Sequence, residues 1–265
     1  MNIRIPIALG AAALAAACSW SSPDDAMTPA EPPPEARPND PMSELSASQV
    51  FMEKGVRYME QGRYDIALKD LQRATELDDS NSDAYNALAV LYQRIDDFAN
   101  ADTSFKKALS LKEDNYAVRN NYGRFLCDQR RYDEAFRQFD LVIGTKLYAQ
   151  PWLPLTNAGI CARSAGKRGE AETYLRRALE MQPDFPPALL EMAKLSRENG
   201  QGLSARAFLQ RYFSVAAPTP ESLVLGIEIE SGLRNHQAAE QYARALAKQF
   251  PNSIEAVKAR RRYGN

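Results

Sequence analysis

The sequence contains a single histidine and three cysteines, which leaves few of the side chains that catalytic and metal sites commonly use. His236 has no second histidine and no cysteine cluster with which to build a nucleophilic triad or a zinc site. The 33 Lys and Arg residues are matched by 34 Asp and Glu residues, so the chain lacks the basic surplus of a nucleic-acid-binding protein. We therefore expect no catalytic site, metal or cofactor, and neither a nucleic acid nor a small-molecule substrate as a ligand.

Long apolar runs are also absent, because the apolar stretch over residues 5–17 is too short to span a bilayer as a helix. Arg4 precedes this stretch, and three alanines stand immediately before Cys18. This arrangement resembles the signal of bacterial lipoproteins, which is cleaved before a cysteine that then carries lipid. The resemblance implies a signal peptide over residues 1–17 and lipidation of Cys18 as the only membrane attachment. The alternative is an ordinary signal peptide, cleaved at the same place, that leaves Cys18 unmodified.

Residues 18–47 are polar and rich in proline. A segment of this composition cannot bury enough apolar surface to offset the entropy lost on ordering, so we expect a lipidated cysteine followed by a disordered tether. Ser19, in place of Asp, resembles the residue that directs Gram-negative lipoproteins to the outer membrane. The expected location is therefore the periplasmic face of the outer membrane.

From residue 48 to residue 265 the sequence repeats itself, and one alanine marks each unit. The six marker residues are Ala67, Ala101, Ala135, Ala171, Ala205 and Ala239. Their spacing is 34 residues except for one gap of 36, which matches the period of tetratricopeptide repeats. The sequence thus predicts an all-α, right-handed superhelical solenoid of six tetratricopeptide repeats, with a C-terminal capping helix over residues 254–263.

Two further positions of the unit indicate close helix packing. A small residue lies twelve positions before the marker alanine in five of the six units, with Ile227 as the exception. A larger apolar residue lies four positions after the marker in five of six, with Ala243 as the exception. Small side chains are expected where two helices cross, and larger ones fill the space beside the crossing.

The first helix of each repeat is expected to line a concave groove with positions 2, 5, 9 and 12 of the unit. The candidate partner-binding residues in repeats one to three are Met52, Val56, Met59, Asn86, Val90, Asn120 and Arg124. This mixture of flexible apolar side chains with amide and guanidinium groups suits an extended or amphipathic peptide. A row of Met residues at helical spacing is equally compatible with core packing. If repeats one to three are not the site, the next candidates are Leu153, Ile160 and Leu190.

Cys127 and Cys161 fall late in the first helices of consecutive repeats, which are neighbours in a solenoid. Disulfides persist in the compartments that exported proteins reach. We expect a disulfide between the two residues, and the alternative is a pair of separately buried thiols.

The segments Asn-Asn-Tyr-Gly-Arg-Phe-Leu-Cys at 120–127 and Arg-Tyr-Asp-Glu-Ala-Phe at 131–136 resemble the type IV pilus biogenesis and stability lipoproteins, the pilotins. The resemblance covers the lipoprotein signal, the tether and the six repeats. It implies a non-catalytic protein that binds secretin subunits of the outer membrane and promotes their localisation and multimerisation. Tetratricopeptide arrays serve many partners, so the alternative is a periplasmic lipoprotein adaptor that docks cell-wall enzymes.

Overall fold

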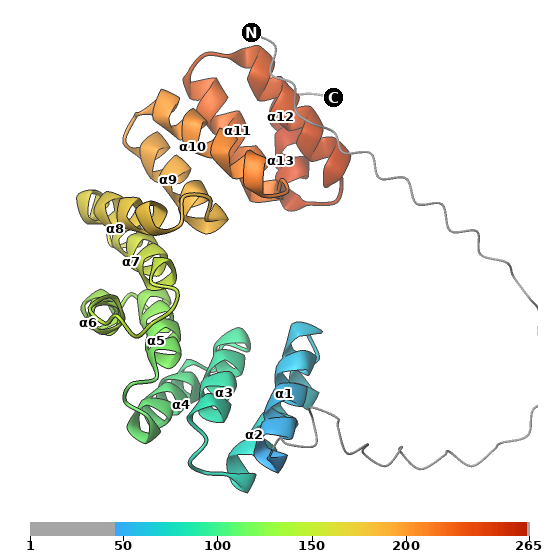
Figure 1. Ribbon diagram of the computed structural model, residues 1–265. Helices are drawn as coiled ribbons and strands as arrows, with labels where there is room; N and C mark the ends of the chain where they lie inside the picture. The colour runs from blue at the N-terminus through green and yellow to red at the C-terminus, as the bar shows by residue number, and fades with distance from the viewer. Residues whose placement is uncertain (1–45, 264–265) are drawn as a thin grey trace, which may run out of the picture. The chain divides into compact units, whose positions relative to one another are not determined.

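The computed structural model describes residues 46–263 (Figure 1). The predicted signal peptide, Cys18 and nearly all of the predicted tether lie outside the described residues. Every regular element between residues 46 and 263 is a helix, and none of these helices is long and apolar enough to cross a membrane. The helices are α1 (Ala47–Glu60), α2 (Tyr64–Leu77), α3 (Ser82–Arg94), α4 (Phe98–Leu111), α5 (Tyr116–Asp128), α6 (Tyr132–Ile143), α7 (Trp152–Ser164), α8 (Arg168–Met181), α9 (Pro186–Glu198), α10 (Gly202–Val215), α11 (Pro220–Gly232), α12 (His236–Gln249) and α13 (Ile254–Tyr263).

The first twelve helices pack as six consecutive pairs, from α1 with α2 to α11 with α12. The second helix of each pair also packs against the first helix of the next pair, and the first helices of successive pairs contact one another. Figure 1 shows α3, α5 and α7 along the inner side of the curved array, with α4, α6 and α8 outside them. The expected all-α array of tetratricopeptide repeats is confirmed, and α13 covers α11 and α12 at its end.

Close helix crossings explain the glycines of the repeat. A Cβ atom added to Gly123 of α5 would lie 2.6 Å from the ring of Phe139 in α6. A Cβ atom on Gly55 would lie equally close to the side chain of Leu71, and one on Gly159 equally close to that of Leu175. In all three pairs the two residues are 16 positions apart. The large residue of the second helix therefore packs directly on the backbone of the first.

The sixth repeat makes the same contact one residue earlier. Gly226 of α11 is the residue without a side chain there, and a Cβ on it would meet the ring of Tyr242 in α12 at 2.9 Å. Ile227, which breaks the expected pattern, is instead 4% exposed and belongs to the core shared with Leu246 and Ala256 of the capping helix. The crossing is thus conserved in geometry but displaced by one position in sequence.

Helix caps also tie neighbouring repeats together. Asn81 caps α3 by accepting a hydrogen bond from the Ala84 backbone N–H, and its amide group donates to the Ser48 hydroxyl of repeat one at 2.9 Å. Asn115 caps α5 and donates in the same way to Ser82 of repeat two, at 3.1 Å. A single side chain thereby caps the first helix of a repeat and links that repeat to the preceding one.

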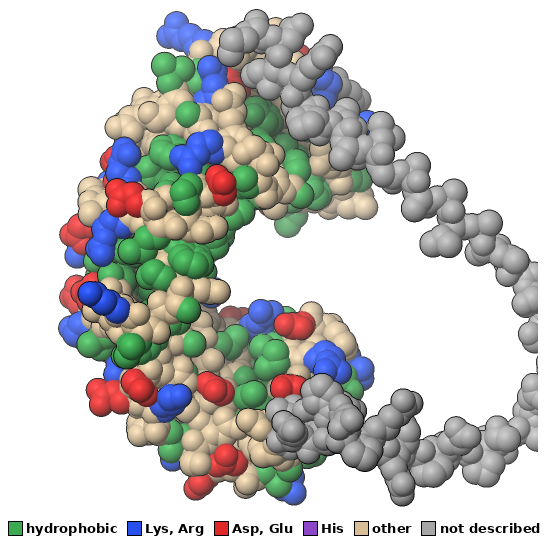
Figure 2. Space-filling model, viewed as in Figure 1, with side chains coloured by type: hydrophobic (Ala, Val, Ile, Leu, Met, Phe, Trp, Pro, Cys, Tyr) green, Lys and Arg blue, Asp and Glu red, His purple; other side chains and the backbone are tan. Residues whose placement is uncertain are grey.

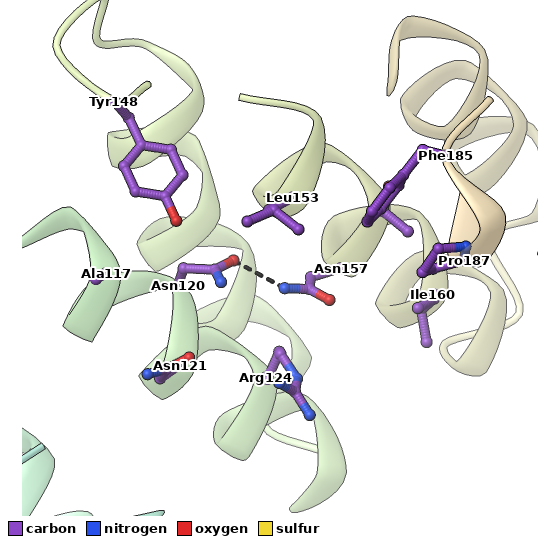
Figure 3. Close-up of a pocket in the computed structure, with 11 residues that line it drawn as sticks. Ala117, Asn120, Asn121, Arg124, Tyr148, Leu153, Asn157, Ile160, Phe185 and Pro187 are labelled. Atoms are coloured by element: carbon purple, nitrogen blue, oxygen red, sulfur yellow. Dashed lines mark hydrogen bonds between the residues drawn. The ribbon is translucent and has the colours of Figure 1, made fainter. Parts of the chain in front are cut away.

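The gap of 36 residues falls between repeats three and four. There α6 has 12 residues, where the other second helices have 14. The connection between α6 and α7 therefore covers residues 144–151, whereas the preceding connection between α4 and α5 covers only 112–115. This longer loop places Tyr148 beside the inner face of the array (Figure 3).

Candidate protein-binding groove

The groove residues predicted in α1 are covered to different extents. Met52 and Val56 are partly buried and pack at the edge of the core between repeats one and two. Met59 is 6% exposed and belongs to that core, together with Leu71 and Leu91. Met59 thus packs between helices and offers almost no surface to a partner, because its position in the last turn of α1 faces the next repeat.

The groove residues predicted in α3 keep part of their surface accessible to solvent. Asn86 and Val90 are both partly buried, and Val90 packs against the cores on either side of α3. Asn86 accepts a hydrogen bond from the amide of Asn121 in α5 at 3.2 Å. This hydrogen bond links α3 to α5 on the inner face of the array.

The predicted residues Asn120 and Arg124 line a pocket of about 320 Å³ between α5, α7 and the start of α9 (Figure 3). Its lining residues are Ala117, Asn120, Asn121, Arg124, Tyr148, Leu153, Thr156, Asn157, Ile160, Phe185 and Pro187. Seven of them occupy positions 2, 5 or 9 of their repeats, as the groove rule requires. Figure 2 shows hydrophobic side chains gathered on the inner side of the array around this hollow.

Four lining residues were not found from the sequence: Asn121 and Asn157, at position 6 of their repeats, and Tyr148 and Phe185. Tyr148 and Phe185 lie in connections between repeats, where the positions of first-helix residues give no guidance. Burial raises the pKa of the Tyr148 hydroxyl, so it stays a neutral hydrogen-bonding group. The gap of 36 residues was the available signal for an unusual loop, but it gave no direction for the side chain.

Polar side chains link the first helices along the inner face. The Asn157 amide donates to Asn120 Oδ1 at 2.9 Å, and Gln93 of α3 donates to Asp128 Oδ2 of α5 at 2.9 Å. Burial raises the pKa of the Asp128 carboxyl, although the charge of Arg124 and the bond from Gln93 act in the opposite direction. The inner face is thus a mixed surface, apolar along α7 and amide-rich along α5.

The charges of repeats four to six largely neutralise one another. Arg163 pairs with Glu191 at 3.0 Å and with Glu198 at 2.9 Å, and Lys194 pairs with Glu191 and Glu221 at 2.5 and 2.6 Å. Burial lowers the pKa of Lys194, but these carboxylates outweigh it and hold the pKa above the ordinary value. A second pocket of about 350 Å³ is lined by Arg163, Lys194, Glu198 and Glu221. These four charged side chains already form ion pairs within the chain, which makes them less available to a charged ligand.

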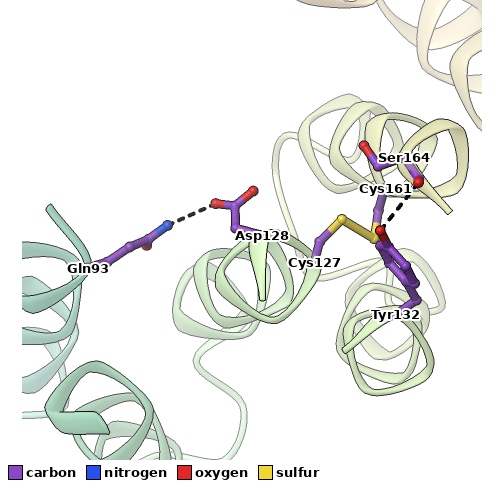
Figure 4. The surroundings of a disulfide bond; sticks show 6 residues. All are labelled: Gln93, Cys127, Asp128, Tyr132, Cys161 and Ser164. Carbon is purple, nitrogen blue, oxygen red and sulfur yellow. Dashed lines mark hydrogen bonds between the residues drawn. A yellow bond between two sulfur atoms is a disulfide. The ribbon is translucent and has the colours of Figure 1, made fainter. Parts of the chain in front are cut away.

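Cys127 of α5 and Cys161 of α7 are joined by a disulfide in the structure, with their Cα atoms 5.7 Å apart (Figure 4). The residues are 34 positions apart, one repeat, and both are buried. The bond connects the two helices that form the main walls of the pocket. Its formation in the protein as it exists in the cell stays a prediction.

Comparison with known proteins relates the array to pilus proteins. Models of the tetratricopeptide repeat match residues 55–96, 82–115 and 162–221. The chain is 30% identical over 209 residues to the type IV pilus assembly protein PilF of Pseudomonas aeruginosa, covering 79% of this chain and 83% of PilF. The crystal structure of PilW, a widely conserved type IV pilus biogenesis factor, is 34% identical with a TM-score of 0.74, covering 81% of this chain and 98% of PilW. The structure of Pseudomonas aeruginosa PilF is 29% identical with a TM-score of 0.68, covering 82% and 97%.

Proposed function

Because this chain belongs to the family of the type IV pilus assembly proteins PilF and PilW, we propose that it binds subunits of the outer-membrane secretin. In this role the protein acts without catalysis and promotes the localisation and multimerisation of secretin subunits during pilus biogenesis. Family membership supports a part in pilus assembly in the cell envelope. The secretin as partner comes from the resemblance of segments 120–127 and 131–136 to the pilotins.

The observation that carries a binding role is the inner face of the array. Its helices α1, α3, α5 and α7 are packed against their second helices, yet Met52, Val56, Leu153 and Ile160 remain only partly buried. Side chains that are not fully covered within their own chain gain free energy when a partner covers them. The amides of α5 supply polar contacts that orient such a partner.

The proposed anchor is the lipid on Cys18, followed by a tether over residues 18–47. A proline-rich segment extends by about 3.1 Å per residue in its polyproline form, so the tether reaches on the order of 80 Å from the membrane. This reach lets the repeats meet secretin subunits in the periplasm before they enter the membrane.

Affinity capture identifies the partner class. The full-length protein, with a tag at its carboxyl end, is isolated from detergent-solubilised envelopes of its own bacterium, and the captured proteins are identified by mass spectrometry. The proposal predicts enrichment of secretin subunits over an untagged control. Enrichment of cell-wall synthases or hydrolases without secretin would instead support the adaptor alternative.

A further inference from the structure

The amide pair at the edge of the pocket has hydrogen-bonding capacity left over. Asn157 Nδ2 donates to Asn120 Oδ1, and among residues 46–263 the Asn120 amide nitrogen and the Asn157 carbonyl oxygen make no other hydrogen bond. Asn157 is partly buried; Asn120 is only 7% exposed, but its amide nitrogen is not a fully buried unsatisfied atom and so reaches the pocket. If both amides were turned over, the pair would still leave one N–H donor and one C=O acceptor. A peptide group presents the complementary acceptor and donor, so the pair matches the main chain of a bound segment.

The opposite wall of the pocket is apolar. Leu153 and Ile160 of α7 and Phe185, which precedes α9, face the hollow and are only partly buried (Figure 3). The volume of about 320 Å³ lies at the small end of the range of ligand pockets. It suits one large apolar side chain together with the main chain that carries it.

Arg124 adds a positive charge at the rim. It is exposed, and among residues 46–263 it forms no ion pair, whereas Arg163 and Lys194 farther along the inner face are each paired with two carboxylates. Asp128, one helical turn later, lies within its electrostatic influence but instead accepts a hydrogen bond from Gln93. The charge of Arg124 is therefore available to a carboxylate of a partner.

The spacing of these groups fits an extended peptide. Arg124 follows Asn120 by four residues on α5, about 6 Å along the helix axis at a rise of 1.5 Å per residue. In an extended chain, residues two positions apart lie on the same side at about 6.6 Å. An apolar side chain in the pocket can thus be accompanied by an acidic one over Arg124.

We propose that this pocket binds an extended segment of a partner protein in which a large apolar residue stands two positions from an acidic residue. The apolar side chain fills the space beside Leu153 and Ile160, the main chain bonds to Asn120 and Asn157, and the acidic side chain pairs with Arg124. The inference deepens the proposed function and rests on it only for the identity of the protein that supplies the segment.

Synthetic peptides test the preference of the pocket without any secretin. The probes are fluorescently labelled, end-capped nonapeptides of Gly and Ser that carry Phe-Ser-Asp or Asp-Ser-Phe at the centre. Matched probes replace Phe with Ala, or Asp with Asn. Binding to the full-length protein in detergent micelles is followed by fluorescence anisotropy. Replacing Phe with Ala should weaken binding about tenfold, as expected for one buried side chain, and replacing Asp with Asn about threefold, as expected for an exposed ion pair.

Variants of the protein assign these preferences to residues. Ile160→Ser should lose most of the preference for Phe over Ala, and Arg124→Gln should lose the preference for Asp over Asn while keeping the preference for Phe. Arg57→Gln is the matched control, because Arg57 is exposed on α1 outside the pocket. Thermal unfolding of each variant checks that it folds, and Arg124→Gln replaces an exposed side chain that has no ion pair to lose.

Absence of saturable binding of both central sequences up to about 5 mM, a value typical of very weak association, would overturn the proposal. It would also be overturned if Arg124→Gln kept the full discrimination between Asp and Asn. The proposed function has a separate outcome. If secretin is not captured but the peptide preferences hold, the secretin assignment fails and the pocket stands. If secretin is captured but the preferences are absent, only this inference fails.

Discussion

Arg131 at the start of α6 donates a hydrogen bond from Nη1 to Asp102 Oδ1 of α4 over 2.6 Å, joining the second and third repeats. The Tyr122 hydroxyl of α5 donates to the same oxygen at 2.9 Å, and Lys106 lies 2.5 Å from Oδ2. Burial raises the pKa of the Asp102 carboxyl, but these three partners outweigh it and hold the pKa below its ordinary value. The ionised carboxylate therefore stabilises the junction between the repeats.

Replacing Asp102 with Asn should lower the free energy of unfolding at pH 7 by roughly 1.5–3 kcal/mol, the range for hydrogen bonds to charged groups. Because the pKa is lower in the folded state, this contribution is fully present above the ordinary carboxyl pKa of about 3.9 and is lost as the pH falls through the lower pKa of the folded state. Urea unfolding of wild type and variant should thus differ at pH 7 and converge as the pH falls through that lower pKa. Asp79→Asn, at an exposed position in the loop before α3, is the control. An equal difference in unfolding free energy between wild type and Asp102→Asn at pH 7 and at low pH would contradict this assignment.

Replacing Gly123 with Ala should destabilise the protein by roughly 1–3 kcal/mol, because the new methyl group would collide with the buried ring of Phe139. Gly169→Ala is the matched control, since Gly169 lies in α8 with open space around it. The same substitution there should stabilise by about 0.4–1 kcal/mol through the unfolded chain. Opposite shifts of the melting temperature are expected, and a stabilised Gly123→Ala variant would contradict the close crossing.

Cys127 and Cys161 should be linked in protein isolated from the periplasm. A bond that closes a loop of 34 residues stabilises by roughly 3–4 kcal/mol in the chain-entropy model. Thiol labelling under denaturing conditions, followed by peptide mass mapping, should modify both residues only after reduction. Efficient labelling of both in the unreduced sample would refute the bond.

Replacing Cys18 with Ala should release the protein from membranes, because a single cysteine is proposed to carry the whole lipid anchor. Cell fractionation and incorporation of radiolabelled palmitate measure the two consequences. Palmitate incorporation into the variant at the wild-type level would show that Cys18 is not the lipidated residue.

The repeat architecture could be predicted because the alanine markers, the small residues and the larger apolar residues each report the same helix crossing. Individual polar contacts between the paired helices were not predictable in this way: Lys54 of α1 lies 3.4 Å from Asp70 of α2, whose side chain is 10% exposed. The displaced crossing at Gly226 was not predicted, because a one-residue shift leaves the period of the repeat unchanged.

The candidate site was predictable only in part. Position 9 of the unit gave Arg124 and the same rule reaches Ile160, whereas position 12 gave Met59, which the structure buries. Whether the last turn of a first helix faces the groove or the next repeat depends on how adjacent repeats are rotated, and periodicity within one helix does not contain that rotation. The orientation of Tyr148 depends on a loop for which no other repeat offers a template.

If the inner face of the array binds secretin, substitutions in the groove should weaken the affinity of the protein for purified secretin subunits. Met52→Ser with Val56→Ser changes two partly buried groove residues and leaves the core residue Met59 in place. Met181→Ser, at an exposed position ending α8, is the matched control. The double variant should fold and bind secretin at least about tenfold more weakly, while the control should bind like wild type. Equal affinity of wild type, control and double variant, or no binding of secretin to the wild type, would contradict it.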